Sequence, residues 1–218
     1  MVSISKEIYA LKEIFNLTFS KYPLANAYHN YPFLLFENVV DKEQCQEIIN
    51  SLENESFQAR LIQKGLDESI RKTILHKPTP FIEHFFSSVI QSKQKEIGEF
   101  FHISLLKGSA IQILEYLPGG FYKRHADNAS ELIKDNRVVG YKEQRKERKL
   151  TTLLFLNDDF SGGEIEFSHL RYKSGKRVIF KPRAASLLVF PSHGLFAHEV
   201  HPVKKAKRYA IVKWWDVL

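Results

Sequence analysis

The stretch KLTTLLFLNDDFSGGEIEFS, residues 149–168, holds two short apolar segments on either side of a turn. Both segments have the length and apolar content of buried β-strands, and the NDDFSGG between them is rich in turn-forming residues. Six similar segments lie between residue 109 and the C-terminus: SAIQILEYL (109–117), FYKRHAD (121–127), KRVIFK (176–181), ASLLVFP (185–191), FAHEV (196–200) and KRYAIVKWW (207–215). About eight strands joined by turns predict a jelly roll or a related double-sheet barrel. A parallel α/β sheet is disfavoured because no helical segments separate these strands.

The first 108 residues have a different pattern, because their apolar residues recur at helical spacing. Two such series are Ile4, Ile8, Leu11 and Phe15, and then Ile82, Phe85, Phe86, Val89, Ile90, Ile97, Phe100 and Phe101. Asp41 and Gln44 form a capping box at the start of a further predicted helix. We therefore predict one domain over residues 1–218, mainly β with flanking helices (α+β): a helix-rich N-terminal support (1–108) and a barrel core (109–218).

Composition narrows the setting in which the chain works. No apolar run approaches the ~20 residues that a membrane-spanning helix requires, and residues 1–15 lack the pattern of a secretory signal. The single cysteine, Cys45, has no disulfide partner within the chain, which agrees with a reducing compartment. We predict a cytoplasmic protein with no membrane partner.

The formal net charge of +7 raises the question of a nucleic-acid partner. In YKEQRKERK (141–149) five bases against two acids leave +3, and HPVKKAKR (201–208) adds four more bases. A site for single-stranded nucleic acid interleaves stacking aromatic residues with its bases, and 141–149 contains only Tyr141. Solvated loops are the simpler interpretation, so a nucleic-acid partner is disfavoured.

The segment FYKRHAD places His125 and Asp127 two residues apart on a predicted strand, so that both side chains project from one face. An imidazole and a carboxylate on one strand supply two metal ligands, and a third histidine from another strand completes a triad with open positions. A structural zinc site would fill all four positions, usually with cysteines. Alone, an H-x-D motif is weak evidence among nine histidines.

Three histidines compete for the third position. His193 lies in the turn PSHG, and His201 precedes Pro202, where a strand is expected to end. His198, within FAHEV, is the best placed on a strand. The sequence therefore favours His125, Asp127 and His198 as a metal triad, and a chance arrangement without a metal stays open.

Arg208 begins the segment KRYAIVKWW. Strand alternation puts Arg208 on one face with Ala210, Val212 and Trp214. If that face looks into the barrel, the guanidinium is a desolvated charge that requires an anion, and a carboxylate is its natural bidentate partner. The alternative is an exposed arginine whose stem alone packs on the protein.

Four segments carry a family resemblance: YLPGGFYKRHAD (116–127), LTTLLFLNDDFSGGEIEF (150–167), LLVFPSHGLFAHEVHPV (187–203) and KRYAIVKWW (207–215). Together they resemble the core of prolyl-hydroxylase-like iron(II)- and 2-oxoglutarate-dependent oxygenases, over residues 111–215. The resemblance implies a double-stranded β-helix in which His125, Asp127 and His198 bind iron and are catalytic, as is Arg208. It implies that Arg208 holds the distal carboxylate of 2-oxoglutarate and that Tyr116 hydrogen-bonds the same co-substrate.

By the same resemblance the chain is a dioxygenase that uses Fe(II), 2-oxoglutarate and O2, with ascorbate as a further candidate. Its expected substrate is an amino-acid side chain, first of all proline in a peptide or protein. A free amino acid or small metabolite is the alternative, followed by a non-catalytic metal-binding barrel. The oligomeric state is left open.

The chain departs from the family between Asp127 and Thr151, where NASELIKDNRVVGYKEQRKERK (128–149) fills a connection that is often shorter. We interpret it as a long polar connection that begins beside the metal site. Such connections often contact substrate. We therefore predict that it orders over the metal when a peptide-like substrate binds.

Overall fold

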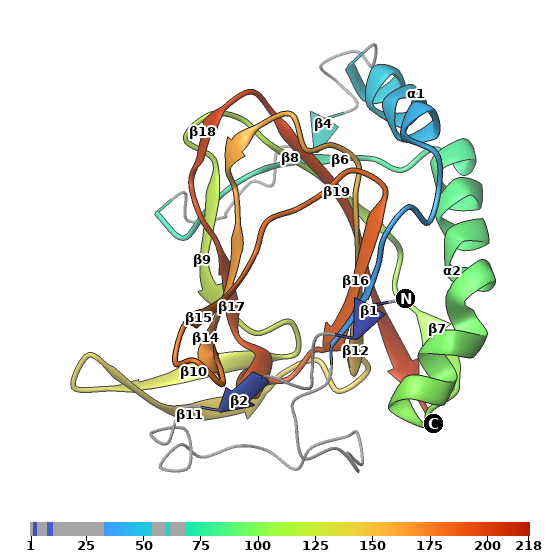
Figure 1. Cartoon of the computed structure of the whole chain (residues 1–218). Coiled ribbons are helices and arrows are strands. Elements are labelled where there is room, and N and C mark those ends of the chain that lie inside the picture. Colours follow the sequence, from blue (N-terminus) through green and yellow to red (C-terminus); the bar gives the residue numbers. More distant parts are fainter. Residues whose placement is uncertain (1, 4–7, 11–32, 54–59, 62–68) are drawn as a thin grey trace.

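The computed structural model describes residues 2–3, 8–10, 33–53, 60–61 and 69–218. Two antiparallel sheets face each other, and two helices cover the outside of one of them (Figure 1). None of the helices in these ranges is long and apolar enough to cross a membrane. The predicted double-stranded β-helix with flanking helices is confirmed.

All eight predicted strands are present. They are β8 (Gln112–Tyr116), β9 (Phe121–His125), β12 (Leu150–Phe155), β14 (Ile165–Tyr172), β15 (Arg177–Phe180), β16 (Ser186–Pro191), β17 (His198–Val200) and β19 (Arg208–Val217). The larger sheet runs β1 (Val2–Ser3), β3 (Leu34–Phe36), β16, β12, β19, β8, β6 (Ile74–His76) and β4 (Arg60–Leu61), and β7 (Leu105–Gly108) also pairs with β19. The smaller runs β15, β14, β17, β9 and β5 (Arg71–Lys72), and β2 (Ile8–Ala10) also pairs with β14. A short pair, β13 (Ser161–Gly162) and β18 (Val203–Lys205), closes one end.

Two helices pack on the outer face of the larger sheet. The helix α1 (Lys42–Glu53) begins after Asp41, whose backbone N–H donates to Gln44 Oε1 at 3.1 Å, so half of the predicted capping box is seen directly. The helix α2 (Pro80–Phe101) is capped by Thr79 and ends at His102, which adopts a left-handed φ of 54°. Their apolar stripes and the outward residues of β8, β12 and β19 form one core. The second helical series of the sequence is therefore confirmed.

The predicted N-terminal helix is wrong where it can be checked. Residues Ile8–Ala10 form strand β2, which pairs with the far end of β14. Ile4, Leu11 and Phe15 lie outside the described residues. A short segment can satisfy its backbone hydrogen bonds by pairing with a free strand edge as well as by forming a helical turn. Tertiary pairing therefore overrides a local helical periodicity of this length. The strands β3, β5 and β6, also from the first 108 residues, were not predicted either.

The connection 128–149 is not the polar loop that the sequence suggested. It forms a β-hairpin of β10 (Ala129–Lys134) and β11 (Arg137–Glu143), closed by Asp135 and Asn136 with φ values of 50° and 57°. Two successive left-handed residues make a type I′ hairpin turn, and the Asp-Asn pair was an available signal for it. The many charges hid the strands, and most side chains in the outer half of the hairpin are exposed on both faces.

A second core lies between the sheets and positions the site. Leu114, Leu153, Phe155, Leu188, Phe190, Ala210, Val212 and Trp214 of the larger sheet meet Ile165, Phe167, Val178, Phe180 and Val200 of the smaller one. Phe33 lies among these rings, 4.6 Å from Phe167 between centroids. Alternation along β19 thus points Ala210, Val212 and Trp214 inward, as expected. The space between the sheets that these side chains leave unfilled is the cavity described next.

Candidate functional site

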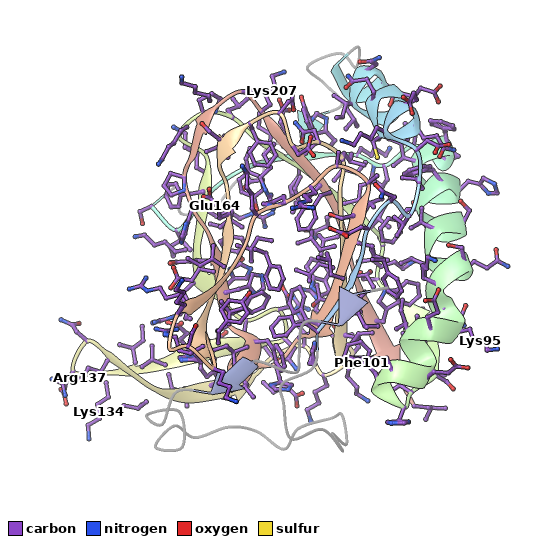
Figure 2. All side chains as sticks on the ribbon, viewed as in Figure 1. Lys95, Phe101, Lys134, Arg137, Glu164 and Lys207 are labelled. Carbon is purple, nitrogen blue, oxygen red and sulfur yellow. The ribbon has the colours of Figure 1, made fainter. Side chains whose placement is uncertain are left out.

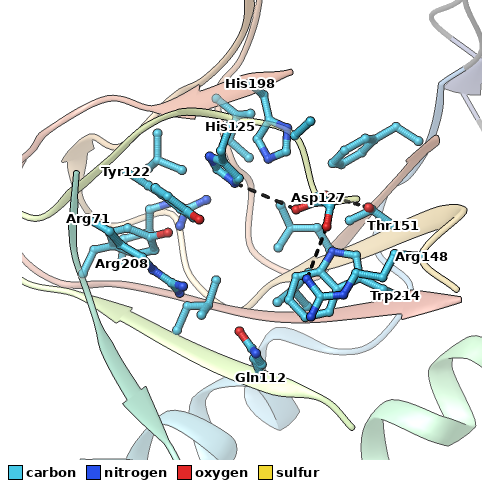
Figure 3. Close-up of a pocket in the computed structure, with 18 residues that line it drawn as sticks. Arg71, Gln112, Tyr122, His125, Asp127, Arg148, Thr151, His198, Arg208 and Trp214 are labelled. Carbon is cyan, nitrogen blue, oxygen red and sulfur yellow. Dashed lines mark hydrogen bonds and ion pairs between the residues drawn. The ribbon is translucent and has the colours of Figure 1, made fainter. Parts of the chain in front are cut away.

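A cavity of about 250 Å³ lies between the two sheets. Its polar lining residues are Arg71, Gln112, Tyr116, Tyr122, His125, Asp127, Arg148, Thr151, His198, Arg208 and Trp214 (Figure 3). The sequence pointed to five of these: Tyr116, His125, Asp127, His198 and Arg208. All five line this one cavity.

His125, Asp127 and His198 meet at one end of the cavity. One ligand atom from each lies within 4.8 Å of the other two, and β17 pairs with β9 so that His198 stands opposite His125. The strand β9 ends at His125, so Asp127 lies in the bend after it rather than on the strand. The bend still brings its Oδ1 to 3.9 Å from His125 Nε2. The three side chains therefore lie together, and their role as metal ligands stays a prediction.

Neighbouring groups orient all three side chains. His125 Nδ1 donates to the Lys123 carbonyl at 2.9 Å, and His198 Nδ1 donates to the Phe196 carbonyl at 3.0 Å. Both rings therefore keep the lone pair of Nε2 available. Thr151 Oγ1 donates to Asp127 Oδ2 at 2.6 Å, which leaves Oδ1 for another partner. Two imidazoles and one carboxylate arranged in this way suit a divalent metal with open positions.

The surroundings of His125 keep its ring neutral. Its ring stacks on Tyr122 with 3.5 Å between centroids. Burial, and then the nearby His198, hold the pKa of His125 well below its usual range. A neutral imidazole is the form that binds a metal.

Arg208 lies deep in the same cavity and is 1% exposed. Its guanidinium is 4.8 Å from the centre of the Tyr116 ring and 5.5 Å from that of Phe155. None of its three side-chain nitrogens has a well-oriented hydrogen-bond partner among the described residues. Burial lowers the pKa of Arg208, and Tyr116 partly offsets that effect, but an arginine stays charged in proteins. A buried guanidinium without an anion is costly, so the cavity is built to receive one.

Register explains why Tyr116 and Arg208 belong together. The strands β8 and β19 pair so that Arg208 stands opposite Tyr116. One position further, on the outer face, Tyr209 stands opposite Glu115 and donates to it at 3.2 Å. Glu115 also bonds His76 of β6 at 2.7 Å, so a buried polar network joins three adjacent strands behind the cavity.

Sequence reasoning missed two cationic residues of the cavity. Arg148 packs on Trp214, 3.9 Å from its ring centre, and donates to the Asp127 carbonyl at 3.3 Å. Arg71 lies 4.7 Å from the centre of the Tyr122 ring. Strand alternation had placed Trp214 on the Arg208 face, but Arg148 read as one charge in a basic run. No signal marked Arg71, which comes from an unpredicted strand.

A second cluster, Glu166, Glu199 and His201, also gathers possible ligand atoms. Arg177 Nη1 donates to both carboxylate oxygens of Glu166, at 2.9 and 3.2 Å, and His201 bonds the same group at 3.1 Å. The buried carboxylate of Glu166 thus already has cationic and hydrogen-bonding partners. This cluster is explained as an ion-pair network.

Comparison with known proteins agrees with this geometry. Residues 111–216 match the 2OG-Fe(II) oxygenase superfamily. This segment belongs to that superfamily. It is 27% identical over 177 residues to a mimivirus protein (Acanthamoeba polyphaga mimivirus) named "Putative prolyl 4-hydroxylase", a match that covers 80% of this chain. The chain spans 66% of that relative, just under two thirds of its length.

Two solved structures share the fold of this oxygenase. One is a prolyl hydroxylase from Trichoplax adhaerens in complex with a hypoxia-inducible-factor peptide fragment, with a TM-score of 0.65 and 22% identity over 84% of this chain and 83% of that one. The other is a Pseudomonas putida prolyl-4-hydroxylase, with a TM-score of 0.62 and 19% identity over 84% of this chain and 91% of that one. At these identities the likeness concerns the fold alone.

A pH effect follows from the anchoring of the hairpin. A hydrogen bond of 2.5 Å joins Tyr141 of β11 to His169 Nε2, and burial lowers the pKa of His169 to about 4. Because the unfolded chain takes up this proton near pH 6.5, the neutral ring stabilises the fold fully above that pH. That contribution is lost as the pH falls towards 4.

We expect His169→Gln, which can still hydrogen-bond Tyr141 but does not titrate, to reduce the fall in melting temperature between pH 7.5 and 4.5. Calorimetry at several pH values measures the difference. His84→Gln, on the exposed face of α2, is the matched control and should follow the wild type. Parallel pH curves for wild type and His169→Gln would contradict the assignment.

Proposed function

We propose that this protein is an Fe(II)- and 2-oxoglutarate-dependent dioxygenase that hydroxylates proline in a peptide or protein. The observation that carries the proposal is the pairing, in one cavity, of a His-Asp-His cluster with a buried guanidinium that has no anionic partner among the described residues. The cluster would bind a divalent metal, and the guanidinium would pair with a dicarboxylate. The superfamily match and the name of the mimivirus relative support the reaction and the substrate.

His125, Asp127 and His198 would hold Fe(II), because two neutral imidazoles and one carboxylate form its usual donor set in such enzymes. Arg208 would hold the distal carboxylate of 2-oxoglutarate, and the Tyr116 hydroxyl would add a hydrogen bond to it. When bound, Fe(II), O2 and 2-oxoglutarate supply the oxidant that replaces one substrate hydrogen with hydroxyl and leaves succinate and CO2. The chain's part is to orient these groups and to exclude bulk water with its apolar walls.

A free amino acid or small metabolite is the second candidate substrate. Arg71 and Arg148 add two guanidiniums to a cavity lining that holds a single carboxylate, that of Asp127. The carboxylate of a small substrate would complement them. A non-catalytic metal-binding barrel is the third reading.

The test is anaerobic reconstitution with Fe(II), followed by O2, 2-oxoglutarate and panels of proline peptides and free amino acids. We expect CO2 release coupled to the gain of one oxygen atom by a proline peptide. Turnover of a free amino acid alone selects the second candidate, and metal binding without turnover selects the third. Assays with and without ascorbate test whether ascorbate supports turnover. A cytoplasmic location stays a prediction that rests on the lone Cys45.

A further inference from the structure

Arg208 is the first residue of β19 and directly follows the turn that joins β18 to this strand. Ala206 in that turn has a left-handed φ of 57°, and Figure 2 shows Lys207 at the same end of the two sheets. Strand ends open more readily than strand centres. A buried guanidinium without a well-oriented hydrogen-bond partner among the described residues would also gain hydration by leaving the cavity. Other contacts are therefore needed to keep Arg208 pointing inward, as Figure 3 shows it.

The side chain of Asn157 holds the backbone on both sides of Arg208. The main-chain ladder between β12 and β19 ends at Phe155. Beyond it, Asn157 Oδ1 accepts the N–H of Tyr209 at 2.8 Å, and Asn157 Nδ2 donates to the carbonyl of Lys207 at 2.7 Å. One side-chain amide thus takes the place of a peptide group of β12 and extends the pairing past Arg208.

The partners of this amide fix its orientation. The Tyr209 N–H can only donate and the Lys207 carbonyl can only accept, which assigns the oxygen and the nitrogen of Asn157. The second hydrogen of Nδ2 goes to Asp159 Oδ1 at 2.7 Å. The Asn157 side chain therefore cannot rotate without losing three hydrogen bonds.

Glu115 holds the side chains of the same two residues on the outer face of the larger sheet. It is buried, and its Oε1 accepts from the Tyr209 hydroxyl at 3.2 Å and lies 3.4 Å from Lys207 Nζ. Its Oε2 lies 2.7 Å from His76 Nε2 of β6. Burial alone would raise the pKa of Glu115, but His76 and Lys207 hold it below its ordinary value. Glu115 is therefore a carboxylate, and hydrogen bonds to a carboxylate are the stronger kind.

Lys207 and Tyr209 are each held twice, through the backbone by Asn157 and through the side chain by Glu115. Because both side chains lie on the outer face, strand alternation sends the side chain between them to the opposite face. These contacts direct Arg208 into the cavity. Its stem then packs on Gly163, where an added Cβ would lie 2.8 Å from Arg208 Cδ.

We propose that Asn157 and Glu115 are positioning residues for Arg208, because together they fix the two residues that flank it and so aim its guanidinium at the distal carboxylate of 2-oxoglutarate. The inference rests on the proposed function, in which Arg208 holds that carboxylate. Neither Asn157 nor Glu115 lines the cavity, so both act through Arg208. Their loss should reduce the preference of the site for a dicarboxylate and leave its affinity for the metal unchanged.

The test compares the binding of two 2-oxo acids to the Mn(II)-loaded protein by isothermal titration. One is 2-oxoglutarate, and the other is 2-oxopentanoate, which has a methyl group in place of the distal carboxylate. The ratio of their dissociation constants measures the contact with Arg208. We expect Asn157→Ala and Glu115→Ala each to reduce this ratio about tenfold, the effect of losing one group that orients a binding residue. The Kd values of 2-oxopentanoate and Mn(II) should not change.

Two further variants separate positioning from general stability. Glu115→Gln keeps an acceptor for the Tyr209 hydroxyl and should retain most of the ratio. Thr152→Val is the matched control, because Thr152 is buried on the same face of the sheet and donates to the Lys213 carbonyl at 3.1 Å, further along β19. It should lower the melting temperature and leave the ratio as in the wild type.

An unchanged ratio in either alanine variant overturns the role of that residue, and so does an equal loss of affinity for both 2-oxo acids. If Asn157→Ala does not fold, Asn157→Asp is judged by the same criterion, since it keeps the acceptor for Tyr209 and loses the donor to Lys207. Arg208→Ala should remove the preference for 2-oxoglutarate, which shows that the proposed function stands even where the positioning role fails. If Arg208→Ala keeps that preference, the proposed role of Arg208 fails, and the inference with it.

Discussion

Asp127→Ala is expected to lower the affinity for a divalent metal by more than about 100-fold, because changes to groups that merely orient a ligand already cost 10- to 100-fold. The variant removes the only anionic donor of the cluster and leaves two imidazoles. Substrate hydroxylation should fall below detection. Metal binding is measured directly by isothermal titration with Fe(II) under argon, or with Mn(II) in air.

Two variants bracket this result. Thr151→Val removes the hydroxyl that donates to Asp127 Oδ2. We expect the metal affinity to fall by about 10- to 100-fold, the usual effect of losing one group that orients a ligand. Glu99→Ala, an exposed carboxylate on α2, should bind metal like the wild type. Unchanged turnover in Asp127→Ala would refute the assignment of the metal centre.

The second large effect is expected at Arg208. Arg208→Ala should weaken 2-oxoglutarate binding by on the order of 100-fold or more, since removing one partner of a buried charge pair costs about 2–5 kcal/mol. The affinity for the metal should change far less, because Arg208 is not among the clustered ligand groups. Competition of 2-oxoglutarate with a fluorescent analogue, in the presence of Mn(II), separates the two affinities.

The matched controls are lysines close in sequence. Lys205 is exposed on β18, and Lys207 lies 3.4 Å from Glu115 on the outer side of the larger sheet. Neither lines the cavity. Lys205→Ala should therefore leave co-substrate binding unchanged, and Arg208→Lys should recover only part of it, because an ammonium lacks the planar fork. If Arg208→Ala binds 2-oxoglutarate normally, Arg208 does not hold the co-substrate.

Local sequence patterns predicted most strands that line the cavity. All eight predicted strands appear because buried strands are short apolar runs between turn residues. The hairpin within residues 128–149 was missed because neither of its strands alternates regularly between apolar and polar residues. Its turn, Asp135-Asn136, also lies among many charged residues. The strand β2 was missed for another reason: its partner, the end of β14, is more than 150 residues away in sequence, beyond any local window.

The site divides in the same way. Two residues of separation bring His125 and Asp127 together where the backbone is extended, and alternation along β19 sets which side Arg208 shares with Trp214. The choice of His198 over His193 and His201 followed from which histidine a strand could carry. In contrast, Arg71 reaches the cavity only because β5 pairs with β9, and no local pattern announces that pairing.

By itself the sequence determined eight strands, the two helices α1 and α2, the three candidate ligands and the candidate anion-binding arginine, because each depends on spacing within a short stretch of chain. Only the tertiary structure decided that these residues line one cavity, that Arg208 is buried with no well-oriented hydrogen-bond partner among the described residues, and that residues 129–143 form a β-hairpin. Those facts depend on which strands pair across the sheets and which side chains lose water, and both are set by contacts between residues far apart in the chain.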